Sequence, residues 1–281
     1  MNLDRYEEYM VNWLTNILDK EWLIKPAGGL TGDAFIAKKG DKRLFLKRNS
    51  APFLAVLSAQ GIVPKLIWTK RMENGDVITA QEWLEGRKLR PDEMKSKQVV
   101  SILRKIHQSS ELLHMLMRLG NRLTTPAEDY KQLILQFAKS PLKAEHETID
   151  QSLTYLKQLL PSTQGHEQVV CHCDLNHNNI IKTKDDKLYL IDWDNAKISD
   201  PFIDYGPILK WYVPESDWDE WLSQNEISKD DKSIARMHWY LLLNTLYYAH
   251  WHQERGENDK VLEQIQLLIE LNDYIKAVIL D

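Results

Sequence analysis

The sequence predicts an α+β protein with two lobes, a small antiparallel β lobe at residues 1–85 and a larger helical lobe at residues 86–281. Two observations support this division. Short β-like runs separated by turn residues fill the chain from residue 22 to residue 81, and amphipathic helical periods dominate after Glu85-Gly86. With 281 residues and 43% hydrophobic content, the chain is long enough to bury two compact cores.

The N-terminal region begins with an amphipathic helix, predicted over residues 4–20 because apolar residues recur there with helical period. The β-like runs that follow are separated by one predicted helix and, at Asn74-Gly75, by a predicted hairpin turn. The predicted helix has Ser50 as its N-cap, Pro52 in its first turn and Gly61 at its end. The β-like runs are residues 22–27, 34–38, 43–47, 66–71 and 76–81.

The C-terminal region is mainly helical. A short β island lies within it and carries the most distinctive polar residues of the chain. Directly after the island, Asp200 and Asp204 are predicted to cap a helix and to brace the preceding loop. The predicted helices are residues 91–110, 128–139, 145–160, 229–255 and 259–280, and the island consists of residues 169–171, 180–182 and 188–191.

The composition argues against several classes of protein. The formal net charge is −5, so no overall positive field is available to hold a polyanion such as DNA. The longest apolar stretch, residues 239–251, is too short and too polar to cross a bilayer. Residues 1–9 lack the pattern of a secretory signal. Cys171 and Cys173 are too close together in the sequence for a disulfide that would stabilise the fold. We therefore predict a cytoplasmic protein that binds neither nucleic acid nor a membrane.

Three polar residues of the island have the spacing of a metal and phosphate site. If its last two runs pair as a hairpin centred between Asp185 and Asp186, then Asn179 lies opposite Asp192. An amide oxygen and a carboxylate placed in this way suit one Mg²⁺, which prefers hard oxygen ligands and leaves positions for phosphate. Asp174 lies on the loop before the hairpin, a position that suits a base for an attacking hydroxyl.

The pattern His-x-Asp-x-x-x-x-Asn at residues 172–179, followed by Leu-Ile-Asp-Trp at residues 190–193, is typical of phosphoryl-transfer enzymes with a protein-kinase-like fold. It resembles the aminoglycoside phosphotransferase and choline kinase superfamily, and residues 22–211 fit that layout. Residues 46–48, 52–64 and 190–195 are most similar to the CcrZ (YtmP-like) group of bacterial cell-cycle regulator kinases.

The superfamily resemblance implies ATP and Mg²⁺ as cofactors and a small molecule with a hydroxyl group as acceptor. It implies Asp174 as catalytic base, Asn179 and Asp192 as Mg²⁺ ligands, Lys47 as the phosphate-binding lysine and His172 as a residue that shapes the loop. The CcrZ-like segments imply a ribose, 2-deoxyribose or nucleoside acceptor, a link to cell-cycle control and DNA replication initiation, and division or replication-initiation proteins as partners. A choline, ethanolamine or aminoglycoside kinase and a nucleotide-binding pseudokinase scaffold are the alternatives.

Two further groups of residues are candidates for nucleotide binding in the β lobe. Backbone N–H groups at Gly28, Gly29 and Gly32 are suited to approach phosphates, although on their own these glycines favour a plain hairpin turn slightly more. The connector residues Glu82 and Leu84 offer backbone groups to adenine, and an ordinary crossover is the alternative.

The sequence also departs from the family pattern. Residues 49–64 contain no acidic residue, whereas such kinases usually pair the third-strand lysine with a helix Glu, so the group that positions Lys47 is open. Cys173 stands where the usual loop has Gly. Residues 211–221 form an acidic aromatic stretch that is either a rim for the acceptor or part of the core. His107, near a helix end, is assigned no catalytic role.

Overall fold

The computed structural model of the chain describes residues 3–27, 33–51 and 53–280. It forms two compact units, residues 1–89 with 177–195, and residues 90–176 with 196–281. The first unit holds a small antiparallel sheet and the second is mainly helical, which confirms the predicted α+β fold class. Segment 177–195 makes its contacts within the first unit, although it lies beyond residue 85 in the chain.

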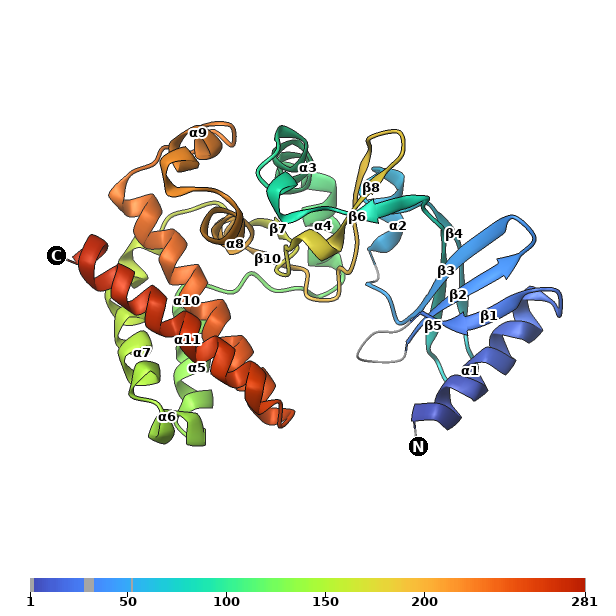
Figure 1. Cartoon of the computed structure of the whole chain (residues 1–281), viewed down its shortest axis with the longest axis horizontal. Helices are drawn as coiled ribbons and strands as arrows, with labels where there is room; N and C mark the ends of the chain where they lie inside the picture. The colour runs from blue at the N-terminus through green and yellow to red at the C-terminus, as the bar shows by residue number, and fades with distance from the viewer. Residues whose placement is uncertain (1–2, 28–32, 52, 281) are drawn as a thin grey trace. The chain divides into compact units, whose positions relative to one another are not determined.

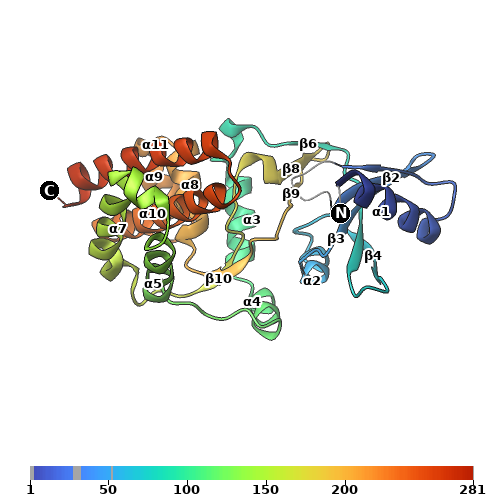
Figure 2. The same cartoon turned by 90° about the horizontal axis from the view of Figure 1, so that it is seen from below.

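A five-stranded antiparallel sheet in the order β1-β2-β3-β5-β4 forms most of the first unit (Figure 1). Helix α1 (Leu3–Leu18) lies alongside this sheet (Figure 2) and buries Met10 and Leu14 against Phe35 and Leu46. Apolar burial on one stripe explains why the opening segment is an amphipathic helix, as its periodicity predicts. The five strands match the predicted β-like runs: β1 Leu23–Pro26, β2 Ala34–Lys39, β3 Lys42–Arg48, β4 Leu66–Arg71 and β5 Val77–Glu82.

Helix α2 (Leu54–Ala59) is shorter than its sequence signals indicate. Its N-cap is Phe53, so the prediction of Ser50 as N-cap is wrong; the Ser50 hydroxyl instead lies 2.7 Å from the Thr79 hydroxyl of the sheet. Gly61 follows the helix with a φ of +66°, a left-handed conformation that glycine adopts without strain, and thus ends it as predicted. The predicted position of Pro52 in the first turn lies outside the described residues.

A second, three-stranded sheet joins segment 177–195 to the end of segment 1–89 within the first unit. Its order is β6-β8-β9, with β6 at Gly86–Lys88, β8 at Ile180–Thr183 and β9 at Leu188–Leu190. Strand β6 was not predicted. Its Gly86 lies so close to β8 that a Cβ atom would be 2.6 Å from the Lys182 carbonyl oxygen, so only glycine fits at this point.

The hairpin of β8 and β9 has a register that differs by one residue from the predicted one. Ile180 pairs with Leu190, and the Ile191 N–H donates to the Asn179 carbonyl at 2.8 Å, so Asn179 lies opposite Ile191 and not opposite Asp192. The cause is a three-residue loop between Thr183 and Lys187, closed by a left-handed residue, Asp186, at a φ of +66°. Such three-residue loops combine a type I turn with one left-handed residue, and their extra residue shifts the pairing by one position relative to a two-residue turn.

The second unit is built around helix α10, whose Trp239 is fully buried and donates its indole N–H to the Leu156 carbonyl at 2.9 Å. Helices α10 and α11 lie side by side (Figure 1), and strands β7 (Val169–Cys171) and β10 (Lys197–Ser199) form a two-stranded antiparallel sheet. The helices are α3 Lys97–His107, α4 Ser110–Arg118, α5 Pro126–Phe137, α6 Pro141–Glu145, α7 Glu147–Leu159, α8 Phe202–Tyr212, α9 Trp218–Ser223, α10 Asp231–Glu254 and α11 Asn258–Tyr274.

The predicted helix at residues 91–110 is wrong at its start. A 3-10 turn at Pro91–Glu93 precedes α3, which begins only at Lys97, and α4 follows as a separate helix. Within the described residues, none of the helices combines the length and the apolar character that crossing a bilayer requires.

The core position of Leu46 in the first unit leads to a stability prediction. Leu46→Ala should lower the free energy of unfolding by about 2–5 kcal/mol, because it leaves a cavity at a fully buried site. Leu23→Ala is the matched control: its side chain lies in β1 and is 57% exposed, so the change should stay within about 0.5 kcal/mol. Urea denaturation followed by circular dichroism measures both, and equal costs would contradict the placement of this core.

Candidate active site

A cluster of opposite charges in the first unit joins residues that are far apart in the sequence. Lys47, on β3, places its Nζ 2.9 Å from Asp192 Oδ1 and 2.8 Å from Asp194 Oδ2. Burial of the lysine lowers its pKa, but the hydrogen bonds that its ammonium donates to Asp194 and Asp192 outweigh this effect, so the pKa of Lys47 is raised overall. The ammonium is therefore charged at neutral pH and shared by two carboxylates.

The segment that carries both carboxylates is anchored by the tryptophan between them. Trp193 is 3% exposed, donates its indole N–H to the Leu190 carbonyl at 2.9 Å, and meets the Phe53 ring edge-on at 5.7 Å between centroids. The Leu190 N–H in turn donates to the Ile62 carbonyl at 2.9 Å. Residues 53–62 thus hold the acidic segment through an aromatic contact and a backbone hydrogen bond.

Asn179 and Asp192 come from adjoining positions of one hairpin stem. The Asn179 carbonyl accepts a hydrogen bond from the Ile191 N–H, and Asp192 is the next residue after Ile191. Asp192 has a φ of +64° and thereby leaves the strand direction. The carboxylates of Asp192 and Asp194 are 49% and 52% exposed. Carboxylate and amide oxygens, such as those of Asp192 and Asn179, are the hard ligands that Mg²⁺ prefers.

Asp194 is a candidate site residue that the sequence reasoning did not select. The missing acidic residue in 49–64 showed that Lys47 needed another partner, and the structure supplies it from the hairpin segment, 147 residues further along the chain. The local signal is weak: Asp194 is the second acid of an Asp-Trp-Asp sequence. Nothing in its spacing to Lys47 could have paired the two residues.

The other residues predicted for nucleotide binding remain predictions. Gly28, Gly29 and Gly32 lie outside the described residues. Glu82 ends β5, and its N–H donates to the Lys65 carbonyl at 2.8 Å, so this donor is already used within the unit. Leu84 lies in the connection between β5 and β6.

In the second unit, Asp174 lies on a loop organised by short-range hydrogen bonds. Its N–H donates to His172 Nδ1 at 3.3 Å, and the Asn176 amide donates to its carboxylate at 3.2 Å. Because His172 Nδ1 accepts, the ring carries its proton on Nε2. His172 is fully buried, in keeping with the expectation that it shapes the loop.

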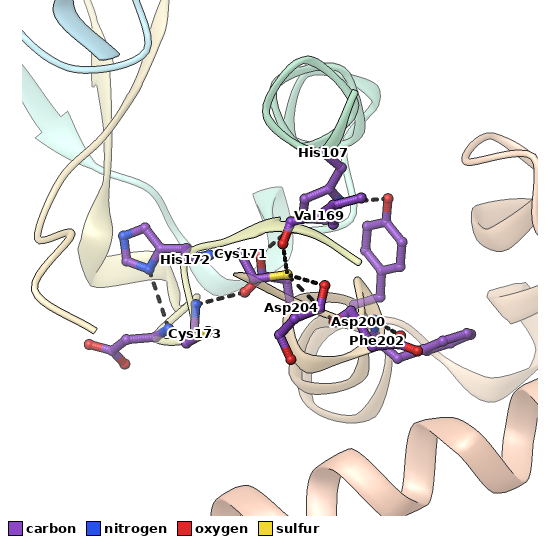
Figure 3. A network of polar contacts seen from close by, with 11 residues as sticks. His107, Val169, Cys171, His172, Cys173, Asp200, Phe202 and Asp204 are labelled. Atoms are coloured by element: carbon purple, nitrogen blue, oxygen red, sulfur yellow. Dashed lines mark hydrogen bonds and ion pairs between the residues drawn. The ribbon is translucent and has the colours of Figure 1, made fainter. Parts of the chain in front are cut away.

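A buried carboxylate holds the start of this loop (Figure 3). Asp204, on α8, accepts the N–H of His172 at 2.9 Å and the N–H of Cys173 at 2.8 Å. His107 Nε2 lies 3.0 Å from the same carboxylate, and its Nδ1 lies 2.8 Å from the Tyr205 hydroxyl. The bracing inferred for Asp204 from the sequence thus corresponds to two backbone hydrogen bonds beside Asp174, and His107 has a structural role.

Cys173 adopts a φ of +64°, in the left-handed region that glycine occupies without strain. This conformation explains why the usual loop has Gly at this position. The hydrogen bond from its N–H to Asp204 holds the backbone there in spite of the side chain.

The possible ligand atoms of His107, Cys171 and Asp204 lie within 4.8 Å of one another. Each already has a hydrogen-bond partner; the single S–H of Cys171 has the Asp200 carbonyl oxygen at 3.5 Å (Figure 3) and the Ser199 carbonyl oxygen at 3.6 Å as acceptors. Burial raises the pKa of the Cys171 thiol well above its usual range, which keeps the thiol protonated. The cluster therefore acts as a hydrogen-bonded support.

The N-cap of α8 is Pro201, so Asp200 is not the cap residue itself; from the position before it, the Asp200 carboxylate accepts the Phe202 N–H at the start of the helix at 2.8 Å. It also accepts from Arg236 Nε at 2.6 Å, which ties the start of α8 to α10. Both side chains are more than nine-tenths buried, so each charge depends on the other for compensation.

In the acidic aromatic stretch at residues 211–221, two indoles belong to the core, whereas the acidic residues Glu215, Asp219 and Glu220 are exposed. Trp218 is buried and donates its indole N–H to the carbonyls of Leu209 and Val213, each at 3.0 Å. Trp221 is also buried, whereas Trp211 is 41% exposed. A role as acceptor rim is therefore wrong for Trp218 and Trp221.

The small antiparallel sheet of the first unit and the helices of the second form an α+β fold of the protein-kinase-like class. The sequence profile of the phosphotransferase enzyme family (APH) matches residues 22–240, well over half of the chain. The chain therefore belongs to this family, and the predicted superfamily and enzyme class, a phosphotransferase with an alcohol group as acceptor, are confirmed.

Several solved structures share this fold. The choline kinase LicA from Streptococcus pneumoniae has 21% sequence identity and a TM-score of 0.71, with 96% of this chain and 99% of that chain covered. The GDP and kanamycin complex of APH(2″)-IIIa has 16% identity and a TM-score of 0.73, with 95% and 98% covered. A choline/ethanolamine kinase family protein from Mesorhizobium loti has 14% identity and a TM-score of 0.66, with 96% and 94% covered.

The left-handed conformation of Cys173 can be tested by stability measurements on two substitutions. Cys173→Gly should be more stable than Cys173→Ala by about 1 kcal/mol, because both remove the thiol and only alanine keeps a Cβ in this region. Thermal unfolding of the two variants, compared with each other, gives the difference. An alanine variant as stable as the glycine variant would contradict the backbone conformation at this position.

Proposed function

We propose that the protein transfers the γ-phosphoryl group of ATP to a hydroxyl of a small molecule, and that the acceptor is a ribose, a 2-deoxyribose or a nucleoside. The observation that carries the proposal of ATP-dependent transfer is the distance of 2.9 Å between Lys47 Nζ and Asp192 Oδ1. It joins the expected phosphate lysine to an expected metal ligand across 145 residues of sequence.

In the proposed reaction, Asp174 accepts the proton of the attacking hydroxyl. The hydrogen bond from Asn176 to one carboxylate oxygen orients the Asp174 side chain, and the bonds of Asp204 to the N–H groups of His172 and Cys173 fix the backbone that precedes it. These contacts support the proposed role because a base acts efficiently only when it is held in position before the reaction.

Lys47, Asn179 and Asp192 form the proposed phosphate and metal site. Lys47 supplies a charged ammonium that is only 19% exposed, which suits it to hold phosphate oxygens. Asn179 and Asp192 would hold Mg²⁺, which neutralises phosphate charge when it is bound. Gly28, Gly29 and Gly32 are proposed to approach the phosphates, and Glu82 and Leu84 the adenine.

The acceptor is proposed from the similarity of residues 46–48, 52–64 and 190–195 to the CcrZ-like kinases. The same similarity underlies the proposed link to cell-cycle and DNA replication initiation control and to division-protein partners. Choline kinases share the fold, as LicA does, and a choline or aminoglycoside acceptor is the second candidate. The burial of Trp218 and Trp221 removes these two indoles as stacking or cage residues for either acceptor. The cytoplasmic location stays a prediction.

A direct screen tests the proposed acceptor. Purified protein with ATP and Mg²⁺ is offered ribose, 2-deoxyribose, deoxyribonucleosides, choline and aminoglycosides, and mass spectrometry detects phosphorylated products. Phosphorylation of a sugar or nucleoside in preference to the others is the expected result. Preference for choline or an aminoglycoside would establish the second candidate, and nucleotide binding without any product across the panel would favour a pseudokinase scaffold.

The role of Asp174 leads to a kinetic prediction. Asp174→Asn should lower kcat by roughly 10²- to 10⁴-fold, the range for loss of a general base, because an amide cannot accept the proton. The melting temperature should change little, since the variant keeps the side-chain shape. Steady-state kinetics with the acceptor found in the screen measures the effect, and unchanged turnover in the folded variant would remove Asp174 from the mechanism.

The proposed metal site leads to a prediction about Mg²⁺ dependence. A chelator should abolish turnover, and Asn179→Ala should raise the Mg²⁺ concentration for half-maximal activity by about 10-fold or more, because one oxygen ligand is lost. Asn178→Ala is the control, since it removes the neighbouring, more exposed amide. Mg²⁺ titrations of activity for both variants decide the matter; an equal response would contradict the ligand role of Asn179.

A further inference from the structure

We propose that Asp194 is the positioning partner of Lys47, in place of the helix acid that residues 49–64 lack, and that it keeps this contact while Asp192 serves the metal. The proposal rests on the proposed function, in which Lys47 holds phosphate oxygens. It assigns a role to a carboxylate outside the base, metal and nucleotide positions.

The first argument is the sharing of one ammonium by two carboxylates. Lys47 Nζ is 2.8 Å from Asp194 Oδ2 and 2.9 Å from Asp192 Oδ1. An ammonium has three N–H donors, so it can keep Asp194 as a partner and still turn its remaining donors to phosphate oxygens. Asp194 is therefore able to position the lysine without competing for all of its hydrogen bonds.

The second argument separates the two carboxylates by their neighbours. Asp192 directly follows Ile191, whose N–H bonds the Asn179 carbonyl, so Asp192 adjoins the other proposed oxygen ligand. Asp194 lies two residues further along, beyond the buried Trp193. Among the described residues, Lys47 is the one hydrogen-bond or ion-pair partner of the Asp194 side chain.

The third argument concerns the region that would normally supply the acid. Phe53 packs edge-on against Trp193, and the Ile62 carbonyl accepts the Leu190 N–H, so residues 53–62 fix the segment that carries Asp194. The region around α2 therefore contributes to the position of Lys47 indirectly, through apolar packing and a backbone bond. A carboxylate on a segment anchored in this way is restricted in its motion, which is what a positioning partner requires.

A double-mutant cycle tests this role. The variants are Asp194→Asn, Lys47→Ala and the double variant, and the measured quantity is kcat/KM for ATP. Asp194→Asn should lower kcat/KM by about ten- to hundredfold in the presence of Lys47, the range for one hydrogen bond to a charged group. In the Lys47→Ala background it should have almost no further effect, because the group it positions is gone. Asp194→Glu should recover part of the loss, since it retains a carboxylate.

The matched control is Asp185→Asn, which removes a carboxylate of the same hairpin that is paired with Lys187 and not with Lys47. It should leave kcat/KM unchanged. A crystal structure with ADP and Mg²⁺ supplies a readout besides activity: Lys47 should stay in ion-pair contact with Asp194 while Asp192 contacts the metal.

The outcomes separate this proposal from the proposed function. An active wild-type enzyme in which the losses from Asp194→Asn and Lys47→Ala simply add, or in which Asp194 contacts the metal and has left Lys47, would overturn the positioning role alone. The positioning role would also be overturned if Asp194→Asn raised the Mg²⁺ concentration needed for activity while its effect on kcat/KM stayed the same with and without Lys47. A wild-type chain that neither binds nor turns over ATP would overturn the proposed function, and this role with it.

Discussion

The charge cluster of Lys47, Asp192 and Asp194 is the constraint on which the first unit depends. It joins the central strand β3 to a hairpin segment 145 residues away, and its lysine is only 19% exposed. A partly buried ammonium is tolerable because two carboxylates compensate its charge. The pairing requires that β8 and β9 end in a fixed position, and the Ile62–Leu190 backbone bond and the Trp193–Phe53 contact provide that position.

The second unit uses a carboxylate in a comparable way. Asp204 is fully buried, and its two oxygens accept backbone N–H groups from the loop that leads to Asp174. Removing such a carboxylate from water is costly, and the hydrogen bonds to two N–H groups and to His107 offset the cost. In both units, an acidic side chain from a later part of the chain fixes an element that local sequence alone leaves undetermined.

This difference explains which features the sequence could predict. The five strands, the opening helix and the enzyme class follow from periodicity and from one local motif, because short-range patterns determine them. The register of the β8–β9 hairpin was wrong by one residue, because the left-handed conformation of Asp186 depends on the loop geometry and has no clear residue signal. The pairing of Asp194 with Lys47 could not be predicted, since it is a contact between distant segments.

The two departures from the family pattern have one physical explanation. Cys173 replaces a glycine at a φ of +64°, and the Asp204 bond to its N–H holds the loop there. The region around α2 lacks an acid, and the hairpin segment brings two carboxylates to Lys47 instead. In each case a long-range contact of a carboxylate maintains a geometry that the local residues do not favour. A sequence can therefore lose a local signature of its family while the structure keeps the arrangement, provided that a charged group elsewhere takes over the interaction.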